Sequence, residues 1–230
     1  MRLLFVHAAG SSGEEWVQQR LAFGGAYDVA TPDLPGHGRS TEAPLGTIEE
    51  MAEWLRRTQD LTRAVVIGHS MGAGVALTLA ARADALRGLV LVGAAPHPRV
   101  PDGFVERVAR DPNVAVERLA TSGFARGTRS TVVEKASAYL ARTDAKVLAA
   151  DFAATAAFDA ASYLPRVRLP ALVVAGAEDR LTTAADAEAV ARGIRGAELS
   201  IIDGAGHMVM LERPREFDER LERFFTGLRP

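Results

Sequence analysis

The most informative segment of the sequence is Ala64–Gly72, which reads Ala-Val-Val-Ile-Gly-His-Ser-Met-Gly and continues into the small-residue segment Ala73–Leu77. Its first four residues are apolar and rich in Val and Ile, which is typical of a buried parallel strand. Gly-x-Ser-x-Gly between a strand and a helix forces a sharp turn that exposes the hydroxyl of Ser70 above the sheet edge. The helix that follows directs its free N–H groups at the same place, where they favour negative charge.

Five further apolar runs are expected to complete a sheet of about six strands. Three are rich in Val, Leu or Ile, namely Leu3–Val6, Gly88–Val92 and Ala171–Ala175, and Tyr27–Thr31 and Glu198–Ile202 are weaker. Helical patterns lie between several of these runs. Alternating strands and helices predict an α/β fold with a doubly wound, mostly parallel sheet.

Two helices have clear start signals. Thr47-Ile48-Glu49-Glu50 is a capping box, and apolar residues then recur at helical spacing. Pro214 suits the first turn of a last helix, whose apolar stripe includes Phe217 and Leu221.

The stretch 97–168 breaks the alternation because it contains helical patterns and no convincing strand. A structureless loop of that length is improbable in a compact domain. We therefore expect a core made of residues 1–96 and 169–230 with a helical cap insertion over 97–168. The alternative is that the insertion only adds packing and has no role in substrate binding.

The composition excludes several classes of protein. The 230 residues carry a net charge of −2, so no basic field is present to hold nucleic acid or an anionic membrane surface. The chain has no cysteine, which excludes disulfides, thiolate metal sites and a cysteine nucleophile. Its five histidines are scattered without metal-ligand spacing, so we expect no metal.

Targeting and cofactor signals are also missing. The apolar run before His7 is too short for a signal peptide, and no run approaches the ~20 residues of a membrane helix. A cytoplasmic protein is the default expectation. Gly10-Ser11-Ser12-Gly13 is not a dinucleotide fingerprint, and there is no phosphate-binding Gly-Lys-Ser or Gly-Lys-Thr, so we expect no cofactor.

Three more segments stand at the ends of expected strands, one before Ser70 in the sequence and two after it. Asp33–Ser40 follows the second strand, Val173–Asp179 ends a later strand in an acidic residue, and Asp203–His207 follows the last strand. With the Gly-x-Ser-x-Gly turn, these segments resemble the α/β-hydrolase family over nearly the whole chain. In that family the nucleophile, the acid and the base follow one another in this order.

The resemblance implies acyl transfer through a covalent intermediate. Ser70 is the implied nucleophile, His207 the base that takes its proton, and Asp179 the acid that orients the imidazole. The backbone N–H groups of Met71 and Ala9 are the implied donors to the oxyanion. Relatives of this fold that are epoxide hydrolases or haloalkane dehalogenases place aspartate at the nucleophile position, which disfavours those activities.

One position departs from the family pattern. Ala8 stands after His7 where the family usually has glycine, and alanine tolerates positive φ poorly. The loop 7–12 is therefore expected either to differ in shape or to use Ala8 itself as the second donor.

Other polar residues have less reactive interpretations. We expect His7 to orient its own loop, His37 to hold the turn 35–39, and His69 to pack beside the serine. His97 is expected at the surface or at a pocket. Two carboxylates compete with Asp179 for the orienting role, namely Asp203 and Asp102.

The leading hypothesis is a carboxylesterase acting on small-molecule esters of small to medium acyl chains. Within the same fold, the alternatives are a thioesterase, an amidase, or a C–C bond hydrolase or lyase, because fold alone does not choose the reaction. A non-catalytic ligand receptor is the alternative of another class. The sequence leaves the oligomeric state open.

Overall fold

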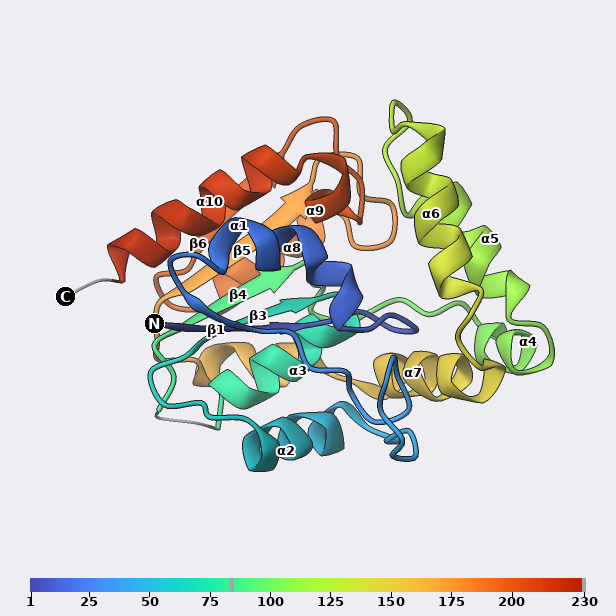
Figure 1. Ribbon diagram of the computed structural model, residues 1–230, viewed down its shortest axis with the longest axis horizontal. Helices are drawn as coiled ribbons and strands as arrows, with labels where there is room; N and C mark the ends of the chain where they lie inside the picture. The colour runs from blue at the N-terminus through green and yellow to red at the C-terminus, as the bar shows by residue number, and fades with distance from the viewer. Residues whose placement is uncertain (83–84, 229–230) are drawn as a thin grey trace.

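A central twisted sheet carries helices on both faces in the computed structural model, which describes residues 1–82 and 85–228 (Figure 1). All strand pairs in the described residues are parallel, and the order is β2-β1-β3-β4-β5-β6. The strands are Arg2–Val6 (β1), Asp28–Ala30 (β2), Val65–His69 (β3), Gly88–Val92 (β4), Ala171–Gly176 (β5) and Glu198–Ile202 (β6). The predicted α/β class and doubly wound sheet are confirmed.

Two apolar layers enclose the sheet because successive side chains of a strand point to opposite faces. Leu4 and Val66 lie in one layer, while Leu3 and Val65 lie in the other. The first layer is covered by Ile48–Thr58 (α2), Met71–Ala80 (α3) and Ala184–Gly193 (α8). The second is covered by Gly13–Trp16 (η1), Val17–Phe23 (α1), Val209–Glu212 (α9) and Pro214–Gly227 (α10).

The predicted helix starts are confirmed. Thr47 accepts the N–H of Glu50 at 3.1 Å, and the Glu50 carboxylate accepts the N–H of Thr47 at 3.1 Å, which completes the capping box of α2. Pro214 is the first residue of α10, where its missing N–H costs no helical hydrogen bond.

Between β4 and β5 the chain forms helices and no strand. Of these six helices, the first four gather at the carboxyl ends of the strands (Figure 1) and share a small apolar cluster around Phe104, Val108 and Leu148, whereas the last two contribute Ala160 and Leu164 to the layer of Leu4 and Val66. They are Phe104–Arg110 (α4), Asn113–Ser122 (α5), Ser130–Leu140 (α6), Ala145–Ala157 (α7), Ala160–Ser162 (η2) and Leu164–Arg166 (η3). We call α4–α7 the cap helices, and the division of the chain into a core and a cap domain stays a prediction.

The helices of the described residues are at most 14 residues long. None of them is alone long and apolar enough to cross a membrane, and one bent pair, α7 with residues 160–166, reaches that length and composition only jointly.

Candidate active site

Ser70 occupies the sharp turn between β3 and α3. Its φ of 53° and ψ of −115° are unusual for a residue with a side chain, and such strain is typical of functional sites. The turn is possible because a Cβ at Gly68 would collide with the carbonyl of Gly72, and a Cβ at Gly72 would collide with the carbonyl of Val6. The two glycines therefore let α3 begin directly against β3 and β1, which leaves the Ser70 side chain at the sheet edge.

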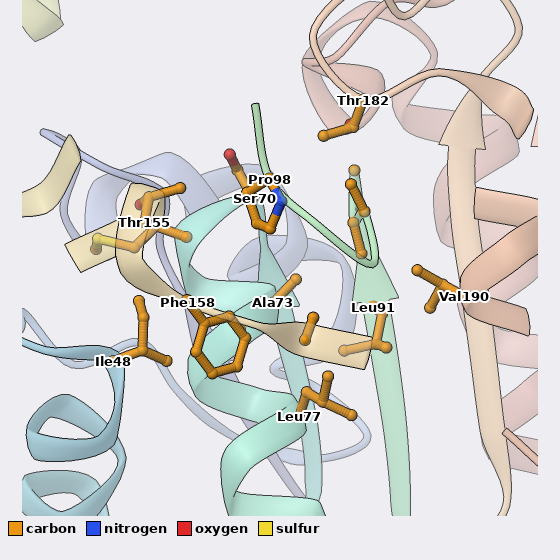
Figure 2. A pocket seen from close by; sticks show the side chains of 16 residues that line it. Ile48, Ser70, Ala73, Leu77, Leu91, Pro98, Thr155, Phe158, Thr182 and Val190 are labelled. Atoms are coloured by element: carbon orange, nitrogen blue, oxygen red, sulfur yellow. The ribbon is translucent and has the colours of Figure 1, made fainter. Parts of the chain in front are cut away.

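An apolar pocket of about 40 Å³ adjoins Ser70, and we call it the small pocket. Figure 2 shows the Ser70 hydroxyl at one end of it and Leu77 at the other, with Phe158 from the chain after α7 alongside. Residues of α3, β4, α7 and α8 line its wall. The cap and the core thus both contribute side chains to the space next to the serine.

His207 and Asp179 are joined by a buried hydrogen bond. The Nδ1 atom of His207 lies 2.8 Å from Oδ2 of Asp179, and both residues are 5% exposed. The other oxygen of Asp179 accepts the backbone N–H groups of Leu181 and Thr182 at 2.8 and 2.9 Å. The hydroxyl of Thr182 donates to Oδ2 at 2.8 Å. These contacts fix the carboxylate against the imidazole.

The charges of this pair stabilise each other. Burial alone would raise the pKa of Asp179, but the charge and hydrogen bond of His207 outweigh it, so the pKa is lowered from its ordinary value. Burial alone would lower the pKa of His207, but the charge and hydrogen bond of Asp179, together with the charges of Glu15 and Glu212, outweigh it, so the pKa is raised above 6.5. The carboxylate is therefore ionised and the imidazole is a stronger base than a free one.

The His207 ring borders the space that Ser70 faces. Thr182 and Gly93 both line the small pocket. The hydroxyl of Thr182 lies 3.2 Å from Nδ1 of His207, and a Cβ on Gly93 would lie 2.9 Å from Cε1 of the same ring. Since Nδ1 is held by Asp179, the remaining ring nitrogen, Nε2, has no hydrogen-bond partner among the described residues. The imidazole of His207 thus has Nδ1 fixed by Asp179 and Nε2 available to accept a proton.

The backbone N–H groups near Ser70 separate into occupied and free ones. In the loop after β1, the N–H of Ala8 donates to Glu15 at 3.2 Å and that of Gly10 donates to Asp151 at 2.7 Å. The N–H of Ala9 has no partner in the described part of the chain. The N–H of Met71, at the first position of α3, has none within its helix. Ala9 and Met71 are therefore available as donors, and Ala8 is already engaged.

A second buried carboxylate–imidazole pair lies behind the serine. Glu15, in η1, lies 2.7 Å from Nδ1 of His69, and Nε2 of His69 lies 3.1 Å from the carbonyl oxygen of His207. Burial would raise the pKa of Glu15, but the charge and hydrogen bond of His69, with smaller contributions from His7 and Ser11, together outweigh it and the pKa is lowered. Because Glu15 also holds the N–H of Ala8, this pair links the loop after β1 to the loop that carries His207.

Of the remaining histidines, His7 and His37 lie side by side, with their ring centroids 4.8 Å apart. His7 donates from Nδ1 to the Ala8 carbonyl at 2.8 Å and accepts the Leu34 N–H at 3.1 Å, so it orients its own loop. Burial, and then the charge of His37, lower the pKa of His7 to about 4, which keeps it neutral. The side chain of His97 is 75% exposed.

The competing carboxylates lie apart from the imidazole. Asp203 and Asp102 are both exposed. The backbone carbonyl of Asp203 accepts a hydrogen bond from the Arg213 side chain at 3.3 Å. No hydrogen bond joins either residue to His207 in the described part of the chain.

Sequence reasoning missed three polar residues at this site, namely Thr182, Glu15 and Asp151. Thr182 is close to Asp179 in sequence, and a hydroxyl there carries no distinctive pattern. Asp151 did leave a signal, because it is the one acidic residue in the apolar helix α7. A lone carboxylate on an apolar helix is buried only when it is paired.

A larger cavity lies on the other side of the loop after β1. Its volume is about 290 Å³, and its wall includes Ala9, Met208 and the α6 residues Lys135, Ala136 and Tyr139. The hydroxyls of Ser12 and Tyr139 are hydrogen-bonded at its edge. We call it the large pocket.

No group of three or more metal-ligating side chains occurs within residues 1–82 and 85–228.

Comparisons with known proteins agree with this architecture. Residues 3–220 match the model of the alpha/beta hydrolase family. Over 247 residues the chain is 31% identical to a pimeloyl-(acyl-carrier protein) methyl ester esterase of Aromatoleum aromaticum, covering 98% of both proteins. A solved thermophilic esterase from Thermogutta terrifontis superimposes with a TM-score of 0.91 at 26% identity, covering 100% of this chain and 91% of that one.

A third relative is longer than this chain. The dihydrolipoyllysine-residue acetyltransferase component of the acetoin cleaving system of Cupriavidus necator is 31% identical over 242 residues, covering 98% of this chain. This chain spans 63% of that protein's length. The family match over most of the sequence is decisive: the chain belongs to the alpha/beta hydrolase family. It is an enzyme of the hydrolase class.

Proposed function

We propose that this enzyme hydrolyses carboxylic esters of small molecules through an acyl-enzyme formed on Ser70. The observation that carries the proposal is the buried 2.8 Å bond between Asp179 and Nδ1 of His207, beside a serine held at a φ of 53°. That arrangement supplies a nucleophile, an oriented base and a charged residue to stabilise the imidazolium.

In the first half of the reaction the Ser70 hydroxyl attacks the ester carbonyl while Nε2 of His207 accepts its proton. The carbonyl oxygen becomes an oxyanion, and the free N–H groups of Met71 and Ala9 are the proposed donors to it. When the tetrahedral intermediate collapses, the imidazolium returns the proton to the departing alcohol. Water then repeats the sequence on the acyl-enzyme and releases the acid.

The two pockets fit the two parts of an ester. The small pocket adjoins Ser70, so it is the proposed site of the acyl chain. The departing alcohol must lie beside the imidazole that protonates it. Met208, the residue after His207, lines the large pocket, which is therefore the proposed site of the alcohol group. The names of the esterase relatives support ester chemistry for this site.

Turnover of p-nitrophenyl acetate tests the proposal against a ligand receptor that has the same fold. We expect saturable release of nitrophenol with a burst whose size equals the enzyme concentration, because the acyl-enzyme accumulates. Parallel assays with a thioester, an anilide and a substrate that has a cleavable C–C bond then distinguish the esterase from a thioesterase, an amidase and a C–C bond hydrolase that would use the same residues. Binding of the ester without turnover would instead identify a receptor.

The pH dependence of kcat/KM follows from His207. Below its pKa the ring is an imidazolium and cannot accept the Ser70 proton, so kcat/KM falls about tenfold per pH unit. Asp179 raises this pKa above 6.5 despite burial, so we expect the inflection on the alkaline side of 6.5. Initial rates from about pH 5 to 8 measure it. His97→Gln, at an exposed histidine, should leave the profile unchanged, and a flat wild-type profile would remove His207 from the base role.

Acyl-chain preference follows from the small pocket. Its volume of about 40 Å³ favours the shortest acyl chains. We expect acetate esters to exceed octanoate esters by at least ~10-fold in kcat/KM, since each excess methylene strains a packed wall.

Shortening the far wall tests this preference. Leu77→Ala should raise the octanoate-to-acetate ratio by about tenfold, because Leu77 closes the end opposite Ser70 (Figure 2). Leu79→Ala is the matched control, since both leucines are 2% exposed on α3 and Leu79 is outside the pocket wall. Equal ratios in the two variants would contradict the assignment of this pocket to the acyl chain.

A further inference from the structure

A carboxylate from the cap helices is buried against the loop that carries the proposed oxyanion donor. Asp151, in the middle of α7, is 0% exposed, and its Oδ2 accepts the N–H of Gly10 at 2.7 Å. Its Oδ1 is buried and has no partner in the described part of the chain. Burying a carboxylate with one unpaired oxygen is costly, so packing alone gives no reason for an aspartate here.

The same oxygen of Asp151 also contacts an imidazole. Nε2 of His37 lies 2.8 Å from Oδ2, and Nδ1 of His37 lies 3.0 Å from the carbonyl of Pro35. Both ring nitrogens face acceptors, so both carry protons when these bonds are made. His37 is then an imidazolium that neutralises Asp151. In agreement, Asp151 outweighs the effect of burial and raises the pKa of His37.

The cap holds Gly10 on both sides of its peptide unit. Asp151 binds its N–H, and the hydroxyl of Thr143, which precedes α7, donates to its carbonyl at 2.6 Å. Gly10 has a φ of 66°, and Leu148 and Leu140 fill the space where a Cβ would be. The conformation of the loop at Ala9, one residue earlier, therefore depends on groups supplied by the insertion.

We propose that Asp151 is a positioning residue, which through Gly10 directs the free N–H of Ala9 toward the oxyanion, with His37 supplying the balancing charge. This inference rests on the proposed function. The cap then has two roles: it lines the small pocket, and it sets the geometry of the second oxyanion donor. An enzyme whose cap is displaced would retain Ser70, His207 and Asp179 but lose one donor.

Asp151→Asn tests this role. The amide cannot neutralise the imidazolium, so His37 loses a proton and the Gly10 N–H loses its charged acceptor. We expect kcat for p-nitrophenyl acetate to fall at least ~10-fold with KM nearly unchanged, less than the 10²–10³ for losing an oxyanion donor outright. In ¹H–¹⁵N spectra of the full chain, the Gly10 amide should move upfield as its bond to a carboxylate is lost.

Asp144→Ala is the matched control. Asp144 caps α7 by accepting the Lys146 N–H at 2.7 Å, and it does not touch Gly10. This variant should lower the thermal midpoint while kcat and the Gly10 resonance stay unchanged. Equal losses of kcat in Asp151→Asn and Asp144→Ala, or wild-type kcat in folded Asp151→Asn, would overturn the inference.

The partner residue extends the test to the case in which Asp151→Asn does not fold. His37→Ala removes the balancing charge and should lower kcat, whereas His37→Gln retains a donor toward Oδ2 and should restore part of it. Wild-type kcat in His37→Ala would overturn the inference. A wild-type enzyme without ester turnover would instead contradict the proposed function, and the Gly10 resonance would still report whether Asp151 holds the loop.

Discussion

Ser70→Ala should abolish ester hydrolysis and labelling by a fluorophosphonate probe while leaving the fold intact. The hydroxyl is the proposed attacking group, so no acyl-enzyme can form without it. In a reference serine protease, removing the nucleophile costs on the order of 10⁶ in kcat, and we expect a loss of at least ~10⁴ here. Alanine meets the same backbone strain at a φ of 53° as serine does, so the thermal midpoint should change little.

Mass spectrometry of the labelled protein identifies the modified residue. We expect one adduct per wild-type chain, located on Ser70. Ser162→Ala is the matched control, because this serine is exposed and donates to the carbonyl of Asp159. It should retain both labelling and turnover. An adduct on another serine, or turnover in folded Ser70→Ala, would remove Ser70 from the nucleophile role.

The fold could be predicted because its signals are local. The run Gly88–Val92 coincides with β4, since a buried parallel strand needs a short apolar run and little else. The weaker run Glu198–Ile202 coincides with β6, an edge strand in which only Ile202 is buried. The requirement for glycine at Gly68 is equally local, because a Cβ there would meet the carbonyl of Gly72, whereas the requirement at Gly72 comes from Val6 on the neighbouring strand β1. The helical character of 97–168 could also be predicted from the sequence, but the position of α4–α7 relative to the sheet could not.

The polar contacts around the site could not be predicted because their partners are far apart in sequence. Asp151 binds Gly10 across 141 residues and His37 across 114. Because α7 is apolar on nearly all sides, its sequence shows neither which face is buried nor what that face meets. His37 was expected to hold its own turn, and it does bond to Pro35, yet its second contact required the cap. The catalytic roles of Ser70, His207 and Asp179 stay predictions.

Asp179→Asn should reduce kcat at least ~10²-fold, against a reference loss of about 10⁴ for the equivalent change in a serine protease. The asparagine oxygen can keep the two N–H bonds from Leu181 and Thr182 that Oδ1 of Asp179 now accepts. Its NH₂ group then faces Nδ1 of His207. Because Nδ1 must accept that proton, the ring proton moves to Nε2, and the nitrogen proposed to accept the Ser70 proton can no longer act as a base.

Asp203→Asn is the matched comparison, since it makes the same chemical change four residues before the histidine. Asp203 is exposed and has no hydrogen bond to His207, so we expect a loss of less than ~10-fold. Steady-state kinetics on both folded variants, with the ¹⁵N shifts of the His207 ring as a readout of its tautomer, decide the question. The reverse ranking would assign the orienting role to Asp203. Two small losses would leave Asp102 as the next carboxylate to replace, although its exposed position gives it no path to the ring without movement of the chain after β4.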